Sequence, residues 1–160
     1  MILPIYVYGQ PVLRKVAEDI APDYPNLKEL IENMFATMER ADGVGLAAPQ
    51  IDISQRIIVV EYAEEEDEKP KSFAVINPEI IKTSAETEMG IEGCLSIPGL
   101  VGDVERNLEI VVRGQNRRGQ PVKIKAKGWL ARIFQHEIDH LDGVLYTDRA
   151  VQVWKPTPEE

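Results

Sequence analysis

Residues 135–143 read QHEIDHLDG, and this stretch contains both histidines of the 160-residue chain. His136 and His140 are four positions apart, with Glu137 beside the first. Side chains at positions i and i+4 of a helix lie one turn apart, with Cβ atoms roughly 6 Å from each other, so two imidazoles can converge on one ion. If these residues are helical, their spacing predicts a site for a divalent metal.

The segment around the histidines has the composition of a helix. Residues 129–141 (WLARIFQHEIDHL) contain no proline and no glycine, and a glycine lies close to each end. Trp129, Ile133, His136 and His140 follow one another at intervals of four, three and four, which places them on one face. We expect this face to point into the core, because it carries large apolar side chains.

The rest of the chain predicts one further helix and two pairs of strands. Residues 25–43 repeat apolar side chains every three or four positions, as an amphipathic helix does. Residues 56–62 and 73–82 are rich in β-branched side chains, and the runs 108–112 and 122–126 flank a turn typical of a hairpin. This order predicts an α+β fold, with mainly antiparallel β-sheets packed around a buried, metal-binding C-terminal helix.

Length and charge limit the class of protein. A chain of this length has the usual size of one domain, so we expect residues 1–160 to form a single catalytic domain. The formal net charge is -9, and the excess is concentrated in residues 61–71 and in the final PEE. Such a surface repels phosphate backbones, which argues against a nucleic-acid partner. We expect a flexible acidic loop at about 63–71 and a short flexible tail at about 155–160.

The cysteine content and the lack of long apolar runs indicate a cytoplasmic protein. Cys94 is the single cysteine and cannot form a disulfide within the chain, and the first residues lack the pattern of a signal peptide. No stretch approaches the roughly 18 apolar residues that a membrane span needs. We therefore expect a protein of the reducing cytoplasm with no membrane partner.

The supply of ligands predicts an open metal site. Structural zinc sites fill four positions with Cys and His, whereas catalytic sites use three protein ligands and leave one position for water. Apart from His136, His140 and Cys94 the chain has no histidine or cysteine, so one monomer cannot build a closed site of that type. Cys94 has two alternative interpretations, a small buried side chain or a thiolate nucleophile. Because the histidines are committed to an ion, we favour Cys94 as the third ligand.

Three segments together resemble the motifs of the peptide deformylases. They are GVGLAAPQ at 43–50, EGCLS at 92–96 and QHEIDH at 135–140, and they occur in the order that the family has. The resemblance extends from PVLR at 11–14 to about Arg149. It implies the peptide deformylase fold and a metal-dependent hydrolase that removes the formyl group from the N-terminal formylmethionine of newly synthesised proteins, releasing formate.

The resemblance also implies a role for each residue of the site. One divalent metal ion per chain is expected, with the ligands Cys94, His136 and His140. Fe(II) is expected in the cell, and zinc, nickel or cobalt can occupy such a site in purified protein. A water molecule on the metal would attack the formyl carbon, with Glu137 as general acid/base. Gln50 and the backbone N–H of Leu95 would donate to the developing oxyanion.

The same resemblance predicts how the substrate binds. The peptide would add as an extended strand beside residues 43–46, where Gly45 allows two backbones to approach closely. The methionine side chain would enter a pocket beside His136, although core packing explains some of these side chains equally well. The residues expected to bind substrate are Gly43, Val44, Gly45, Glu92, Gly93, Trp129 and Ile133. Arg106 matches an arginine of the family, and we hypothesise that it pairs with Asp139 and supports the metal helix; the alternative is a surface ion pair.

Two features depart from the family pattern. Many bacterial members carry a basic C-terminal helix that docks on the ribosome, whereas residues 149–160 (RAVQVWKPTPEE) are short, acidic and contain proline. The expected partners are therefore formylated nascent peptides, met in transient proximity to the ribosome without a docking helix. The acidic residues 63–71 are the second departure.

Three other functions fit part of the pattern. They are an HExxH metalloprotease that cleaves internal peptide bonds, a non-enzymatic metal-binding module with a structural or sensing role, and a cysteine hydrolase. Substrate preference distinguishes the first from a deformylase. A Glu137→Gln variant that keeps its metal and loses turnover excludes the second, and inhibition by a chelator excludes the third.

Overall fold

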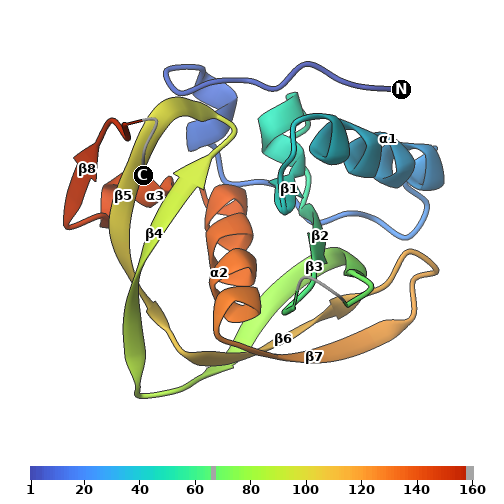
Figure 1. Cartoon of the computed structure of the whole chain (residues 1–160). Coiled ribbons are helices and arrows are strands. Elements are labelled where there is room, and N and C mark those ends of the chain that lie inside the picture. The colour runs from blue at the N-terminus through green and yellow to red at the C-terminus, as the bar shows by residue number, and fades with distance from the viewer. Residues whose placement is uncertain (66–67, 158–160) are drawn as a thin grey trace.

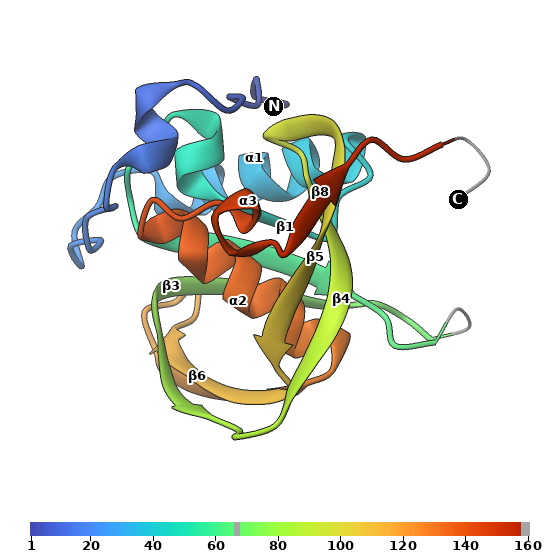
Figure 2. The same ribbon diagram turned by 90° about the vertical axis from the view of Figure 1, so that its left-hand side faces the viewer.

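In the part of the chain that the computed structural model describes, residues 1–65 and 68–157, two antiparallel β-sheets enclose one central helix (Figures 1 and 2). The helices are α1 (Leu27–Arg40), α2 (Trp129–Leu141) and α3 (Tyr146–Arg149), with 3-10 turns η1 (Pro11–Arg14) and η2 (Ala48–Ile51). The strands are β1 (Gly45–Ala47), β2 (Ile57–Tyr62), β3 (Lys71–Thr83), β4 (Thr87–Cys94), β5 (Ile97–Asn107), β6 (Glu109–Gln115), β7 (Pro121–Lys127) and β8 (Gln152–Trp154). The predicted α+β fold is confirmed.

The larger sheet contains the strands that β-branched residues predict. Its order is β1-β2-β3-β6-β7, and every neighbouring pair is antiparallel. Both predicted strand pairs are confirmed, with ends that differ by a few residues. The register of β3 against β6 shifts between Ile76 and Glu79, around Pro78. Proline has no backbone N–H to donate, so it is tolerated in a strand at an irregularity of this kind.

Strand β2 is buried on both faces, which explains its uninterrupted apolar run. Ile58 and Val60 pack in the cluster that contains α2, whereas Ile57 and Val59 pack in the cluster that contains α1. Successive side chains of a strand point to opposite faces, so a strand between two helices needs an apolar residue at every position. The larger sheet is thereby held between α1 and α2.

A long hairpin of β4 and β5 forms most of the smaller sheet, whose order is β4-β5-β8. Its strands pair from Thr87 opposite Asn107 to Gly93 opposite Val101, and β8 pairs with β5 on the other side. The sequence patterns do not predict this hairpin, because glycine is disfavoured in strands and here interrupts the alternation of apolar side chains. The interrupting residues are Gly90, Gly93, Gly99 and Gly102.

Helix α2 lies between the two sheets, and eleven of its thirteen residues are buried. Phe134, Ile138 and Leu141 pack against apolar side chains of the larger sheet. The prediction that Trp129 points into the core is wrong, since 50% of its surface is exposed. Helical side chains lean toward the N-terminus, so the ring of this first residue extends beyond the packed turns and lies against the Arg132 guanidinium.

The predicted acidic loop and tail are covered only in part. Residues 66–67 and 158–160 lie outside the described residues, and Lys71, the last residue of the predicted loop, begins β3. The single catalytic domain and the flexibility of these segments stay predictions. No helix among the described residues is long and apolar enough to cross a membrane.

Candidate active site

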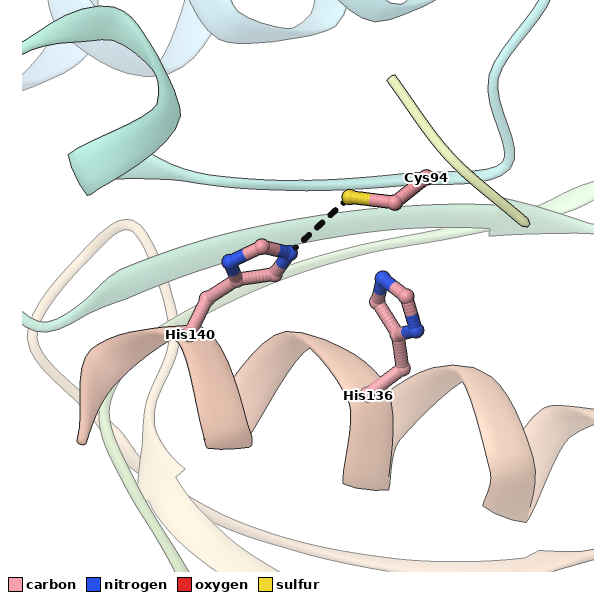
Figure 3. Close-up of side chains that lie close together, drawn as sticks. All are labelled: Cys94, His136 and His140. Carbon is pink, nitrogen blue, oxygen red and sulfur yellow. Dashed lines mark hydrogen bonds between the residues drawn. The ribbon is translucent and has the colours of Figure 1, made fainter. Parts of the chain in front are cut away.

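One sulfur and two imidazoles converge between α2 and the end of β4. Cys94 Sγ lies 3.3 Å from His140 Nε2, and a ligating atom of each of Cys94, His136 and His140 lies within 4.8 Å of the others. Figure 3 shows both rings rising from α2 toward the Cys94 side chain. A thiolate and two imidazoles form a donor set that suits zinc, iron and related transition metals. The three residues therefore fit a metal ion of this class.

The end of β4 is shaped so that Cys94 meets the helix. The register against β5 shifts between Gly93 and Cys94, and residues 95–96 form the turn into β5. A bulge of this kind re-aims the side chains that follow it. Leu95, the predicted oxyanion donor, therefore lies in the turn directly after the sulfur.

Glu92 determines which nitrogen of His136 is available to a metal. His136 Nδ1 lies 2.9 Å from Glu92 Oε1. Burial disfavours ionisation of Glu92, but hydrogen bonds from Arg106 and His136 outweigh it and lower its pKa to about 2. An ionised carboxylate only accepts hydrogen bonds, so Nδ1 of His136 carries the proton and Nε2 is left for an ion.

His140 is held in the form that binds metals. Burial lowers its pKa well below the usual value, and the charge of Arg106 acts in the same direction. A neutral imidazole has a lone pair to offer, and Nε2 is the nitrogen that faces Cys94. Its Nδ1 is buried and has no hydrogen-bond partner within the described residues.

Arg106 connects the metal helix to the strand that carries Glu92. Its Nη1 donates to Asp139 Oδ2 at 2.7 Å, and its Nε and Nη2 donate to Glu92 at 2.8 and 2.9 Å. Arg106 is 4% exposed, so this is not a surface ion pair. Asp139 also accepts two hydrogen bonds from Arg149. The structure thus brings Arg106 and Asp139 together behind the site.

Glu137 is buried on the same helix and touches strand β1. A Cβ atom placed on Gly45 would lie 2.5 Å from Glu137 Oε2, so glycine leaves room for this carboxylate where it now lies. Glu137 Oε1 is buried without a hydrogen-bond partner among the described residues. Burial is the main cause that raises the pKa of Glu137 to about 7. We expected Gly45 to admit a second backbone, and it also admits this side chain.

Gln50 faces the metal ligands with its amide nitrogen. Its Oε1 accepts a hydrogen bond from the Ala47 N–H at 2.9 Å, which fixes the orientation of the amide. Its Nε2 then donates to Ser96 Oγ at 3.1 Å and toward Cys94 Sγ at 3.6 Å. The donor group of Gln50 is therefore directed at the site.

A cavity of about 480 Å³ opens onto these residues. It is bordered by β1 and β4, each of which lies at the edge of its sheet within the described residues. Every residue expected to bind substrate lines it, and so do Gln50, Leu95, Cys94, His136 and Glu137. His140 belongs to the ligand cluster but is not among the lining residues, and neither are Arg106 and Asp139.

Arg132 and Ser96 are among the residues of this region that the sequence predictions do not include. Arg132 lines the cavity and contacts Glu92. The sequence feature that could have identified it is its charge within the otherwise apolar run WLARIF. Ser96 accepts the Gln50 hydrogen bond and is the last residue of the motif EGCLS. Their roles depend on contacts with residues about 40 positions away, which local patterns do not reveal.

Comparison with known proteins identifies the family. A model of the polypeptide deformylase family matches residues 2–155. The chain belongs to the peptide deformylase family. A peptide deformylase of Desulforudis audaxviator is 44% identical over 96% of the chain and 97% of the relative. One of Carboxydothermus hydrogenoformans is 50% identical over 89% of each.

Solved structures of the family have the same fold. The crystal structure of peptide deformylase from Thermotoga maritima matches with a TM-score of 0.86 and 47% identity, covering 95% of this chain and 99% of that one. A class I type b peptide deformylase from Acinetobacter baumannii, in a crystal structure with Met-Ala-Ser bound, matches with a TM-score of 0.86 and 36% identity, over 93% and 98%. The predicted fold, the metal site of Cys94, His136 and His140, and the activity as a hydrolase that deformylates N-formylmethionine are confirmed.

Loss of one imidazole is expected to remove the metal. His140→Ala deletes one of three ligands, so its affinity for Co(II) should fall by more than the roughly 10- to 100-fold that loss of an outer partner costs. Competition with a chelator measures this affinity. Arg113→Met, which breaks an exposed ion pair with Glu79, is the control and should bind Co(II) normally. Unchanged affinity in His140→Ala would contradict the ligand assignment.

Proposed function

We propose that the cavity deformylates peptides with Glu137 as the group that moves the proton and with Gln50 and the Leu95 N–H as donors to the reacting oxygen. The observation that carries the proposal is that Glu137, Gln50 and Leu95 line the same cavity as Cys94 and His136. The general base, the oxyanion donors and the metal ligands of a hydrolase must all reach one reacting carbon.

The metal in the cell is proposed to be Fe(II). Its ligands would be Cys94, His136 and His140, a set that zinc, nickel or cobalt can also occupy. When bound, a divalent ion supplies Lewis acidity, which lowers the pKa of a water molecule toward about 7 and polarises the formyl carbonyl. Because the chain offers three Cys and His ligands, they would leave a position on the ion for solvent.

Glu137 would accept a proton from the attacking water and deliver it to the departing amine. Burial gives this carboxyl a high pKa, about 7, whereas a cation nearby favours the ionised form. The carboxylate is then the form that meets substrate and accepts the proton, and the carboxylic acid so formed is strong enough to return it to the amine. Its contact with Gly45 limits where the carboxylate can lie.

Gln50 and Leu95 would stabilise the negative charge that grows on the formyl oxygen. The Gln50 amide is already oriented by Ala47 and Ser96, so it loses little freedom in the reaction. Leu95 lies in the turn after Cys94 and lines the cavity, and its backbone N–H would face the reacting oxygen. Preorganised donors of this kind typically contribute on the order of 10²- to 10³-fold to turnover.

The substrate peptide would bind as an added strand between the edges of β1 and β4. Both edges border the cavity, and main-chain pairing reads little sequence beyond the first residue. Its methionine side chain would lie against Val44, Ile133 and the half-exposed ring of Trp129. The crystal structure of the related Acinetobacter baumannii peptide deformylase with Met-Ala-Ser bound supports a peptide as the ligand.

The proposed substrates in the cell are formylated nascent peptides, met in the cytoplasm. Docking on the ribosome through a basic C-terminal helix is not part of the proposal, because Gln152–Trp154 form β8, which pairs with β5. Arg106 is proposed to support the site by holding Asp139 of α2 and Glu92 of β4 at the same time.

Removing the carboxylate of Glu137 should lower the rate of formate release without weakening metal binding. Glu137→Gln keeps the shape of the side chain, so Co(II) should remain bound while formate release falls about 10²- to 10⁴-fold. Glu79→Gln, at an exposed residue, is the matched control and should turn over normally. A Glu137→Gln enzyme with near-normal turnover would eliminate Glu137 as the proton carrier.

A methyl group on Gly45 should act through Glu137. Gly45→Ala places a Cβ within 2.9 Å of three atoms of the Glu137 side chain, which must move. A displacement of about 1 Å at a reacting group can cost roughly 10²-fold in turnover. We expect formate release to fall by that order, while Co(II) content and the unfolding temperature stay near their normal values. A fall in Co(II) content would instead show that the substitution disturbs the metal ligands and does not act through Glu137 alone.

The metal and the substrate class can be tested in one anaerobic experiment. We expect about one iron per purified chain and formate release from a formyl-Met peptide, but no reaction with its acetylated analogue and no cleavage of an unmodified protein. A chelator should stop the reaction. Another ion as the main metal would overturn the iron assignment, and cleavage of internal peptide bonds would favour a protease.

A further inference from the structure

Arg132 is a buried arginine that none of the roles above requires. It lies on α2, one turn before His136, and is 6% exposed. Its Nη1 donates to Glu92 Oε2 at 2.7 Å and to the Val104 carbonyl at 2.8 Å, and its Nη2 donates to the Glu88 carbonyl at 2.7 Å. One planar group thus joins α2 to both strands of the hairpin β4–β5.

Glu92 receives four hydrogen bonds, two on each oxygen. Arg106 donates to both oxygens, Arg132 Nη1 donates to Oε2, and His136 Nδ1 lies at Oε1. Two parallel hydrogen bonds from Arg106, on β5, set the plane of the carboxylate. Arg132, on α2, donates a further hydrogen bond to Oε2. The carboxylate is then held from two elements, which fixes where Oε1 meets His136.

We propose that Arg132 is a positioning residue for the metal centre: its guanidinium fixes the Glu92 carboxylate and, through it, the ring of His136. The inference rests on the role of His136 as a metal ligand. Removing a carboxylate that holds a ligating histidine typically lowers metal affinity by about 10- to 100-fold. Arg132 would in turn hold the carboxylate that holds His136. A lysine cannot take its place fully, because its ammonium lacks the planar fork that reaches Glu92, Val104 and Glu88 together.

Strand β4 is built to admit this guanidinium. A Cβ atom on Gly90 would lie 2.7 Å from Arg132 Cζ and 2.8 Å from its Nε and Nη2. The backbone of Gly90 does not have a positive φ angle, so alanine is compatible with its conformation. Gly90→Ala would therefore displace the arginine without changing any ionisable group.

The first test compares Co(II) binding in matched arginine variants. Arg132→Met should weaken Co(II) binding by about 10-fold or more and alter the absorption spectrum of bound Co(II), because the geometry of His136 changes. Arg132→Lys should show a smaller loss, and Arg113→Met should show none. Gly90→Ala should weaken binding in the same direction as Arg132→Met. Normal affinity and spectrum in folded Arg132→Met would overturn the proposal.

A double-mutant cycle distinguishes positioning through Glu92 from a general loss of structure. If Arg132 acts through Glu92, Arg132→Met should cause little further loss of Co(II) affinity in a Glu92→Gln background. An equal loss in both backgrounds would show that Arg132 does not act through Glu92. If Arg132→Met fails to fold, Arg132→Lys and Gly90→Ala decide: normal Co(II) affinity in both overturns the proposal. Because formate release is not measured, failure of the proposed proton and oxyanion roles leaves this test unaffected.

Discussion

The metal ligands come from two layers of the fold, and a buried ion-pair cluster joins these layers beside them. Cys94 ends a strand of the smaller sheet, and the histidines belong to α2, which packs on the larger sheet. Glu92 and Arg106 lie on the strands, and Arg106 reaches Asp139 on the helix. This cluster adds polar contacts of defined geometry to the apolar packing that holds the sulfur and the imidazoles together.

Burying these charged groups costs free energy, which indicates that the cluster positions the metal ligands rather than stabilising the fold. Glu92 and Arg106 are each almost fully buried, and removing charges from water costs several kcal/mol per ion unless hydrogen bonds compensate. Here both oxygens of Glu92 are paired twice, so the compensation is nearly complete. An apolar replacement would stabilise the fold as well, but it could not select the tautomer of His136. The cluster therefore contributes more to the orientation and tautomer of His136 than to the stability of the fold.

The sequence predicts the parts of this site that local periodicity encodes. The four-residue spacing of the histidines and the apolar pattern around them predict α2, and two β-branched runs predict β2 and β3. The contacts of Arg132 with Glu92 and of Gln50 with Ser96 span 40 and 46 positions, and no local pattern encodes them. Trp129 follows the helical period of the core face, yet its position at the first turn exposes it.

The hairpin β4–β5 escapes prediction for a reason connected with the site itself. The two strands that border the cavity approach α2 through glycines: Gly45 of β1 meets Glu137, and Gly90 of β4 meets Arg132. At both points a polar side chain of the helix occupies the space that a Cβ would fill. Glycine weakens a strand because it adds no side-chain packing, and an edge strand has a partner on one side only. These glycines lower the strand preference of β1 and β4 but allow both strands to approach α2 closely. The alternation of apolar side chains that would have predicted β4 is therefore interrupted where a side chain of α2 occupies the space.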